Sequence, residues 1–260
     1  MSSGTQVLVE TRDSVLQVTL NRPQKRNALS RSMLTELCNV FATAAADRTL
    51  LAAVLQGAGE SCFAAGGDLR DLSSVRSMDD AMAMAASGRT ALEAVRGFPV
   101  PVIAALNGDA LGGGAELALA CDFRIMAAHA RIGFIHGRLN IATAWGGGVD
   151  LMRLLGPATG LRLLARSELV DAGTALAMGL ADGTARSDEK LADAVQRFVE
   201  PILRQTPQVT RAYKALALAA RRGASHETLA ALETRTFAET WVHDDHWAAA
   251  DKILRKGGQS

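Results

Sequence analysis

Two glycine-rich loops hold the residues whose types and spacing could support catalysis. The first spans residues 63–69 and contains Gly67 and Asp68, and the second spans residues 107–117 and contains a glycine triplet before Glu116. Glycine lets the backbone approach a ligand closely, and a glycine cluster that opens a helix directs unsatisfied N–H donors toward an incoming oxygen. One N–H group from each loop could therefore bind a thioester oxygen and stabilise the negative charge of an enolate or tetrahedral state.

Glycine runs also occur in flexible turns and in phosphate-binding loops, so other functions must be weighed. The first loop lacks the lysine and hydroxyl residue of a Walker A sequence, and neither loop matches the dinucleotide-binding fingerprint. Both loops follow predicted strands. Because ligands gather at the carboxyl ends of strands in parallel sheets, this position favours a binding site.

The segments around these loops predict an α/β fold. Apolar runs indicate strands at residues 7–10, 15–20, 51–56, 100–106, 123–127 and 130–134. Ser30 is a suitable N-cap for a helix that ends near residue 46, and further helices are expected at residues 78–96, 115–120, 148–155, 157–165, 171–178, 188–205, 207–221, 226–241 and 245–255. Strands that alternate with helices predict right-handed crossovers and a mainly parallel sheet in the first half, with helices dominating from Gly148 onward.

The composition excludes several classes of protein. The chain has 260 residues, 48% of them hydrophobic, and a formal net charge of +1. This apolar content argues against disorder, and the near-zero charge argues against a nucleic-acid partner. The longest apolar runs are far shorter than the roughly 20 residues of a membrane span, so no membrane partner is expected. The polar residues 1–6 lack a signal-peptide pattern, which favours a cytoplasmic location.

No sequence pattern indicates a metal centre. The cysteines Cys38, Cys62 and Cys121 are widely spaced and are expected to be reduced and buried. His243 and His246 are three residues apart, but a third ligand is not evident. We therefore expect no bound metal.

Three motifs occur in a fixed order along the chain. They are Leu20-Asn21-Arg22-Pro23 with Asn27-Ala28-Leu29, Phe63-Ala64-Ala65-Gly66-Gly67-Asp68-Leu69, and Leu111-Gly112-Gly113-Gly114-Ala115-Glu116-Leu117 with Cys121-Asp122. This order resembles the enoyl-CoA hydratase/isomerase (crotonase) superfamily from about residue 7 to residue 185. The resemblance implies a ClpP/crotonase-like spiral of ββα units at residues 1–200. It also implies a helical oligomerisation subdomain at residues 201–260 that closes homotrimers or dimers of trimers.

The same resemblance assigns functional residues. It implies that the N–H groups of Gly67 and Gly113 form an oxyanion hole for an acyl-coenzyme A thioester. Coenzyme A is then part of the substrate, and no further cofactor is expected. The resemblance places the substrate-binding residues at Lys25, Arg26 and Ala28, along the coenzyme A moiety, and at Ala65 and Asp68, where Asp68 helps to hold the first loop.

The acid and base positions depart from the hydratase pattern. Hydratases of this superfamily use two glutamates, and two carboxylates in a dry pocket can serve as acid and base on one water. Glu116 matches the first glutamate, but His136 stands where the second would be. Histidine changes charge near neutral pH and can donate a proton or bind a carboxylate. We therefore expect Glu116 and His136 to share the positioning and proton-delivery roles in an order that the sequence leaves open.

A closer resemblance covers about 50 residues. The run from Leu111 to Arg124, with Phe134-Ile135-His136 and Ala144-Trp145-Gly146-Gly147, is similar to ethylmalonyl-CoA decarboxylases. It implies decarboxylation of an ethylmalonyl- or methylmalonyl-CoA by-product of fatty acid metabolism. Trp145 either lines the acyl pocket, as a substrate-binding residue, or is an aromatic residue packed in a turn. A hydratase, isomerase or thioester hydrolase is an alternative. A non-catalytic protein that binds coenzyme A, including an RNA-binding relative, is a further one.

Overall fold

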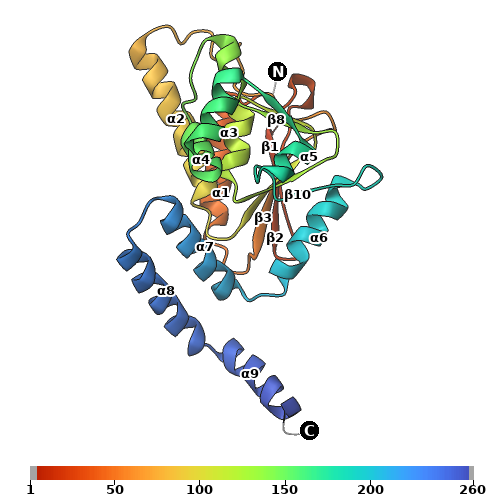
Figure 1. Ribbon diagram of the computed structural model, residues 1–260, viewed down its shortest axis with the longest axis vertical. Helices are drawn as coiled ribbons and strands as arrows, with labels where there is room; N and C mark the ends of the chain where they lie inside the picture. Colours follow the sequence, from red (N-terminus) through yellow and green to blue (C-terminus); the bar gives the residue numbers. More distant parts are fainter. Residues whose placement is uncertain (1–4, 258–260) are drawn as a thin grey trace.

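Two β-sheets and the helices around them form the body of the molecule (Figure 1). The computed structural model describes residues 5–257, so residues 1–4 of the polar N-terminal segment lie outside the described part. The larger sheet has the strand order β1 (Val7–Arg12), β2 (Val15–Leu20), β3 (Ala52–Gly57), β5 (Val102–Leu106), β7 (Phe123–Met126) and β10 (Gly183–Thr184). The smaller sheet has the order β4 (Cys62–Ala64), β6 (Asp109–Leu111), β8 (Arg131–Gly133) and β9 (Leu169–Asp171).

Helices follow the strands and dominate the second half of the described chain. They are α1 (Arg31–Ala44), α2 (Met78–Arg96), α3 (Gly113–Ala120), α4 (Gly147–Arg166), α5 (Ala172–Ala177), α6 (Leu191–Leu203), α7 (Pro207–Arg221), α8 (His226–Trp241) and α9 (Asp244–Gly257). Two short 3-10 helices, η1 (Pro23–Lys25) and η2 (Ile135–Leu139), lie in loops. Ser30 accepts a hydrogen bond from the N–H group of Met33, as expected of the α1 N-cap.

Successive strands alternate between the two sheets. β3, β5 and β7 are parallel neighbours in the larger sheet, whereas β4, β6 and β8 are parallel neighbours in the smaller one. A helix follows each pair of strands: α2 follows β3 and β4, α3 follows β5 and β6, and α4 follows β7 and β8. The predicted repetition of ββα units is therefore confirmed.

The strands next to the glycine loops differ from the predicted ones. The sequence placed the loops after strands 51–56 and 100–106, but a further short strand forms in each loop region: β4 at the start of the first loop and β6 within the second. β9 and β10 were also not predicted. These four strands have two or three residues each, which is too short for a hydrophobic period, and they form because a paired neighbour completes their hydrogen bonds. The two helices predicted at 148–155 and 157–165 are confirmed as the two segments of α4, which are separated by the non-helical backbone of Gly156 (φ 76°, ψ 158°).

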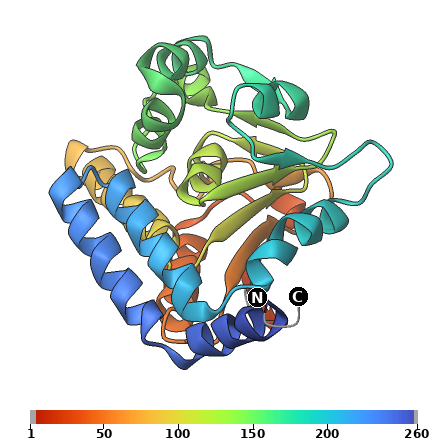
Figure 2. The same cartoon turned by 60° about the horizontal axis from the view of Figure 1, so that its bottom comes forward.

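The hydrophobic core has two parts on opposite faces of the larger sheet. The larger cluster joins the sheet to α1, α2 and α3 and includes the perpendicular ring pair Phe41 and Phe98, whose centroids are 5.1 Å apart. The smaller cluster joins the other face to α6 through Val195 and Val199. Figure 2 shows the larger sheet between α6 and the helices α1 and α2. The sheet is thus covered on both faces, which leaves its strand ends to form a site.

The C-terminal helices differ in how they contact the body. The buried ammonium of Lys214 in α7 contacts both carboxylate oxygens of Asp122, at 2.5 and 2.6 Å. By contrast, α8 has no buried residue, and Figure 1 shows α8 and α9 extending away from the sheets. The division into a core and an oligomerisation subdomain stays a prediction. No helix in the described part of the chain combines the length and apolar character needed to cross a membrane.

Candidate functional site

The two candidate oxyanion donors lie at the ends of adjacent parallel strands. The first glycine loop follows β4, and α3 begins two residues after β6. A Cβ placed on Gly66, in a backbone conformation with φ of 98°, would lie 3.5 Å from the Gly113 nitrogen. The pairing of β4 with β6 therefore brings the first loop against the start of α3.

Among the described residues, the N–H groups of Gly67 and Gly113 donate to no protein acceptor. Gly113 is the first residue of α3, so its N–H group has no acceptor within the helix. Gly67 forms an isolated bridge with Leu29, but this bridge uses the N–H groups of Leu29 and Asp68. The N–H group of Gly67 is not consumed by it. Both N–H groups are therefore available as donors at the ends of neighbouring strands.

Asp68 holds the first loop in place. Its Oδ2 accepts a hydrogen bond of 2.7 Å from Nη2 of Arg22, and Lys25 Nζ lies 3.7 Å from the same oxygen. Its Oδ1 accepts from the N–H groups of Arg70 and Asp71. Burial acts to raise the pKa of Asp68, but the hydrogen bonds and the neighbouring cations outweigh it and hold the pKa below 3.8. Asp68 is therefore ionised and engaged within the protein.

The segment from Lys25 to Ala28 adjoins the first loop. The side chains of Lys25 and Arg26 are 49% and 56% exposed, and their cationic ends lie 3.7 Å from carboxylate oxygens of Asp68 and Asp109, respectively. The carbonyl of Arg26 accepts from the N–H group of Ala65, and the carbonyl of Ala28 accepts from Arg22. This segment and Ala65 are therefore joined, with two exposed cations beside them that could meet phosphate groups.

Glu116 is buried and accepts hydrogen bonds at both carboxylate oxygens. Oε2 accepts from the N–H groups of Trp145 (2.9 Å) and Gly147 (2.8 Å). Oε1 lies 3.4 Å from the N–H group of Ala144 and 3.0 Å from Nε2 of His136. A carboxylate offers about four lone-pair positions, so these four donors fill them. Glu116 is thus a fixed acceptor that orders residues 144–147.

His136 lies in η2, beside the start of α3. Its Nε2 contacts Glu116 and lies 3.9 Å from the position that a Cβ on Gly112 would take. The contact with a carboxylate places a proton on Nε2, because only an N–H group can donate there. Its Nδ1 is buried, with no hydrogen-bond partner among the described residues. The structure therefore brings together Glu116 and His136, which are 20 residues apart in the sequence.

Trp145 lies between α2 and the two glycine loops. A Cβ on Gly113 would meet its ring at 2.3 Å, one on Gly88 at 2.2 Å, and one on Gly67 at 3.7 Å. The indole therefore packs directly on backbone at these positions. The side chain is buried, and its ring borders both candidate oxyanion donors.

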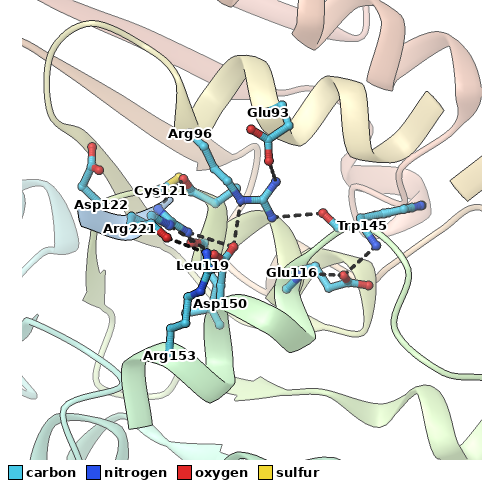
Figure 3. A network of polar contacts seen from close by, with 12 residues as sticks. Glu93, Arg96, Glu116, Leu119, Cys121, Asp122, Trp145, Asp150, Arg153 and Arg221 are labelled. Carbon is cyan, nitrogen blue, oxygen red and sulfur yellow. Dashed lines mark hydrogen bonds and ion pairs between the residues drawn. The ribbon is translucent and has the colours of Figure 1, made fainter. Parts of the chain in front are cut away.

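A buried charge network, shown in Figure 3, holds the Trp145 segment from the opposite side. Arg96 donates from Nη2 to the Trp145 carbonyl (3.0 Å) and from Nε to Asp150 (2.8 Å). Asp150 also pairs with Arg221 of α7, which in turn donates to the Leu119 carbonyl near the end of α3. Glu116 and Arg96 thus bind the N–H and carbonyl groups of the same residue.

Sequence reasoning missed several of these residues. Arg22, Gly88, Arg96 and Asp150 were given no role. Arg96 reads as the basic last turn of a helix before Gly97, and Gly88 reads as an ordinary small residue in an alanine-rich helix. The available signal was indirect: a glycine inside a helix costs about 1 kcal/mol relative to alanine and needs a packing reason.

The repeated ββα units and the paired glycine loops define an enzyme of the crotonase fold. The chain belongs to the enoyl-CoA hydratase/isomerase family, whose family model matches residues 10–256. The predicted resemblance to this superfamily is confirmed, and the protein is an acyl-CoA enzyme of that family.

Individual relatives differ in the reaction that their names give. A short-chain-enoyl-CoA hydratase of Clostridium acetobutylicum is 31% identical over 96% of this chain and 95% of its own. An ethylmalonyl-CoA decarboxylase of Xenopus laevis is 28% identical over 92% of this chain and 80% of its own. The crystal structure of an enoyl-CoA hydratase from Bacillus anthracis superposes with a TM-score of 0.90 at 29% identity, over 97% of both chains. The hydratase relative is thus slightly more similar than the decarboxylase, and similarity alone leaves the reaction open.

Proposed function

We propose that the protein decarboxylates a malonyl-type acyl-CoA, such as ethylmalonyl- or methylmalonyl-CoA. The observation that carries this proposal is the saturation of the Glu116 carboxylate by three backbone N–H groups and His136. Hydration by a glutamate pair needs carboxylates that are free to accept and return protons of one water. Decarboxylation has no such need.

The reaction would use the described residues in the following way. The substrate thioester oxygen binds to the N–H groups of Gly67 and Gly113. The bond between the α-carbon and the carboxylate breaks, its electron pair moves into the thioester as an enolate, and carbon dioxide leaves. The two N–H donors stabilise the enolate oxygen, and one such donor typically contributes about 3 kcal/mol or more. A proton then adds to the α-carbon and restores the thioester.

His136 is our candidate for the group that delivers this proton. Its Nε2 is engaged by the Glu116 carboxylate, which fixes the orientation of the ring. Its Nδ1 has no protein partner in the described part of the chain and so could hand a proton to the site. Glu116 would position His136 and the Trp145 segment rather than exchange protons itself.

Coenzyme A would bind outside this centre. Lys25 and Arg26 present exposed cations next to Ala65 and the first glycine loop, where they could contact phosphate oxygens. Asp68 would contribute by fixing the loop that carries Gly67. In this proposal the assembly is a homotrimer or a dimer of trimers, as the family resemblance implies.

Hydration of a short enoyl-CoA is the second candidate. It is favoured by the higher identity to hydratases and by the presence of Glu116 at the first glutamate position. It would require Glu116 to release one of its backbone donors during turnover. The replacement of the second glutamate by His136 argues against it.

Mass spectrometry of the purified protein with ethylmalonyl-CoA, methylmalonyl-CoA and crotonyl-CoA in parallel distinguishes these reactions. We expect loss of carbon dioxide from a malonyl thioester and no change in crotonyl-CoA. Addition of water to crotonyl-CoA, with the malonyl thioesters intact, would establish the hydratase instead. Binding without turnover of any of the three would contradict both.

A further inference from the structure

We propose that Trp145 is a specificity-determining residue: its indole closes the inner end of the acyl pocket and restricts the enzyme to short acyl groups. The inference rests on the proposed function only in taking Gly67 and Gly113 as the donors to the thioester oxygen. It does not depend on which reaction follows.

The first observation is the slot of glycines that holds the indole. Gly88 in the middle of α2, Gly113 at the start of α3 and Gly67 all border the ring, and any side chain at Gly88 or Gly113 would overlap it. Gly88 is buried within a regular helix, where glycine costs about 1 kcal/mol relative to alanine. The contact with the Trp145 ring explains why a glycine occupies this position, because any larger residue would overlap the ring. The slot therefore places a bulky apolar group directly beside the point where the thioester oxygen would bind.

The second observation is that hydrogen bonds hold the backbone of Trp145 at both its N–H group and its carbonyl. Its N–H group donates to Glu116 and its carbonyl accepts from Arg96, while Arg89 donates to the carbonyl of Ala144. Arg96 is only 4% exposed and is itself paired with Asp150. Moving the Trp145 backbone would remove one hydrogen bond from each of two buried charged groups, Glu116 and Arg96, which is unfavourable. Trp145 thus forms a rigid wall.

The third observation is the face of α2 that continues from Gly88. Ala85, Met84 and Ala81 precede Gly88 by three, four and seven residues and so lie on the same side of the helix. All three are partly exposed, unlike Gly88, which Trp145 covers. An apolar strip of two alanines and one methionine therefore runs along α2 and ends at the indole. An acyl group held by the two donors would lie against this strip, with Trp145 at its inner end.

The test measures binding of saturated thioesters, which neither decarboxylation nor hydration consumes. Isothermal titration of wild type with acetyl-, butyryl- and octanoyl-CoA should show tight binding of the short thioesters and weak binding of octanoyl-CoA. In Trp145→Ala, the affinity for octanoyl-CoA relative to butyryl-CoA should rise about tenfold or more, because the wall is removed. Affinity for free coenzyme A should not change.

Alanine substitutions of two glycines test the slot while Trp145 itself is not replaced. In Gly88→Ala the new methyl group would overlap the ring and push it toward the pocket, so binding of butyryl-CoA should weaken while free coenzyme A binds as before. Gly173→Ala is the control, since its Cβ would meet only a carboxylate oxygen of Asp171 at 3.4 Å. Trp145→Phe, a smaller aromatic, should give an intermediate chain-length preference and serves if the alanine variant does not fold.

The outcomes separate this inference from the proposed reaction. If wild type binds octanoyl-CoA as tightly as butyryl-CoA, or if Trp145→Ala keeps the wild-type preference, Trp145 is not the limiting wall. If the preference shifts as expected but no malonyl thioester loses carbon dioxide, the size limit holds and the proposed decarboxylation is wrong.

Discussion

At the level of single residues, the Glu116 carboxylate and the His136 imidazole form a pair whose members differ in how many of their hydrogen-bonding positions are occupied. All the acceptor positions of Glu116 are filled, mostly by backbone, whereas His136 keeps one ring nitrogen without a partner in the described part of the chain. A group that must exchange protons needs access to the substrate. In the proposed reaction this difference favours positioning by Glu116 and proton delivery by His136, whose unpartnered Nδ1 is the nitrogen not held by Glu116.

Substitution of each residue by glutamine should separate the two roles. Glu116→Gln puts an NH2 group among N–H donors, so the free energy of unfolding should fall by about 1–3 kcal/mol along with activity. His136→Gln should lower kcat by about 10²–10⁴ with little change in Tm. Thermal unfolding and turnover of both variants check this. A stable but inactive Glu116→Gln beside an active His136→Gln would reverse the assignment.

The Arg22–Asp68 pair makes a second residue-level prediction. Both side chains are buried, with exposed fractions of 9% and 7%. Removing one partner of a buried pair leaves an uncompensated charge, so Arg22→Met should lower the free energy of unfolding by about 3 kcal/mol at neutral pH. Urea unfolding measures this loss. Lys25→Met is the control, because that exposed cation 3.7 Å away should contribute less than about 1 kcal/mol.

The same pair should respond to pH in a defined direction. The pKa of Asp68 is lowered in the folded protein. Its contribution to stability is therefore fully present above the unfolded pKa of about 3.9 and is lost as pH falls through the lower folded pKa. The stability difference between wild type and Arg22→Met should narrow in that acidic range. A difference that stays constant from neutral pH to below the folded pKa would contradict the role of Asp68.

At the level of elements, α7 is held to the body by buried cations. Lys214 pairs with Asp122, which also accepts from the N–H group of Val102 at the start of β5. Burial lowers the pKa of Lys214, and the attraction of Asp122 opposes this effect. Near the end of the same helix, Arg221 pairs with Asp150 and donates to the last carbonyls of α3. The network thus connects α7 to the segment that carries Trp145.

A double-mutant cycle should reveal how much the Lys214 pair contributes. Lys214→Leu leaves the partly buried Asp122 carboxylate without its ammonium partner and should cost about 3 kcal/mol. Adding Asp122→Asn removes the lone charge while keeping an acceptor for Val102, so the double variant should recover part of that loss. Thermal unfolding of the three variants measures the coupling. Strictly additive losses would show that the pair is not coupled.

At the level of the whole molecule, α8 and α9 present apolar side chains to solvent. The exposed set on these helices comprises Phe237 (59%), Trp241 (45%), Trp247 (49%), Ile253 (73%) and Leu254 (68%), with Val242 (73%) between the helices. Large exposed apolar surface usually marks an interaction site. Closed symmetric assemblies cover such surface with the same surface of another copy or a neighbouring one.

We expect the protein to sediment as a homotrimer or a dimer of trimers. The double substitution Ile253→Asp with Leu254→Asp should place charges in the contact and produce lighter species in sedimentation velocity. Asp251→Asn with Lys252→Gln, on the same helix but at polar positions, is the control and should leave the assembly unchanged. A monomeric wild type would contradict the expectation.

The sequence by itself determined the features that follow from local backbone requirements. Gly66, Gly67 and the triplet at 112–114 are needed where the chain turns or approaches a ligand, and Ser30 is needed at a helix N-terminus. Such requirements select a particular residue type at one position, so they can be recognised in the sequence. The motifs that contain these residues, in their order along the chain, carried the resemblance to the family, and that resemblance implied the ββα repetition and both oxyanion candidates.

Only the tertiary structure decided which groups meet. Glu116 binds N–H groups about 30 residues away, Arg22 meets Asp68 across 46 residues, and Trp145 packs on Gly88. The short strands β4 and β6, which bring the two glycine loops together, exist only because they pair with each other. These contacts depend on burial and on partners from distant segments, and neither has a periodicity or composition that can be recognised along the chain. For this reason the sequence indicated the candidate catalytic residues, but the arrangement that separates their roles required the fold.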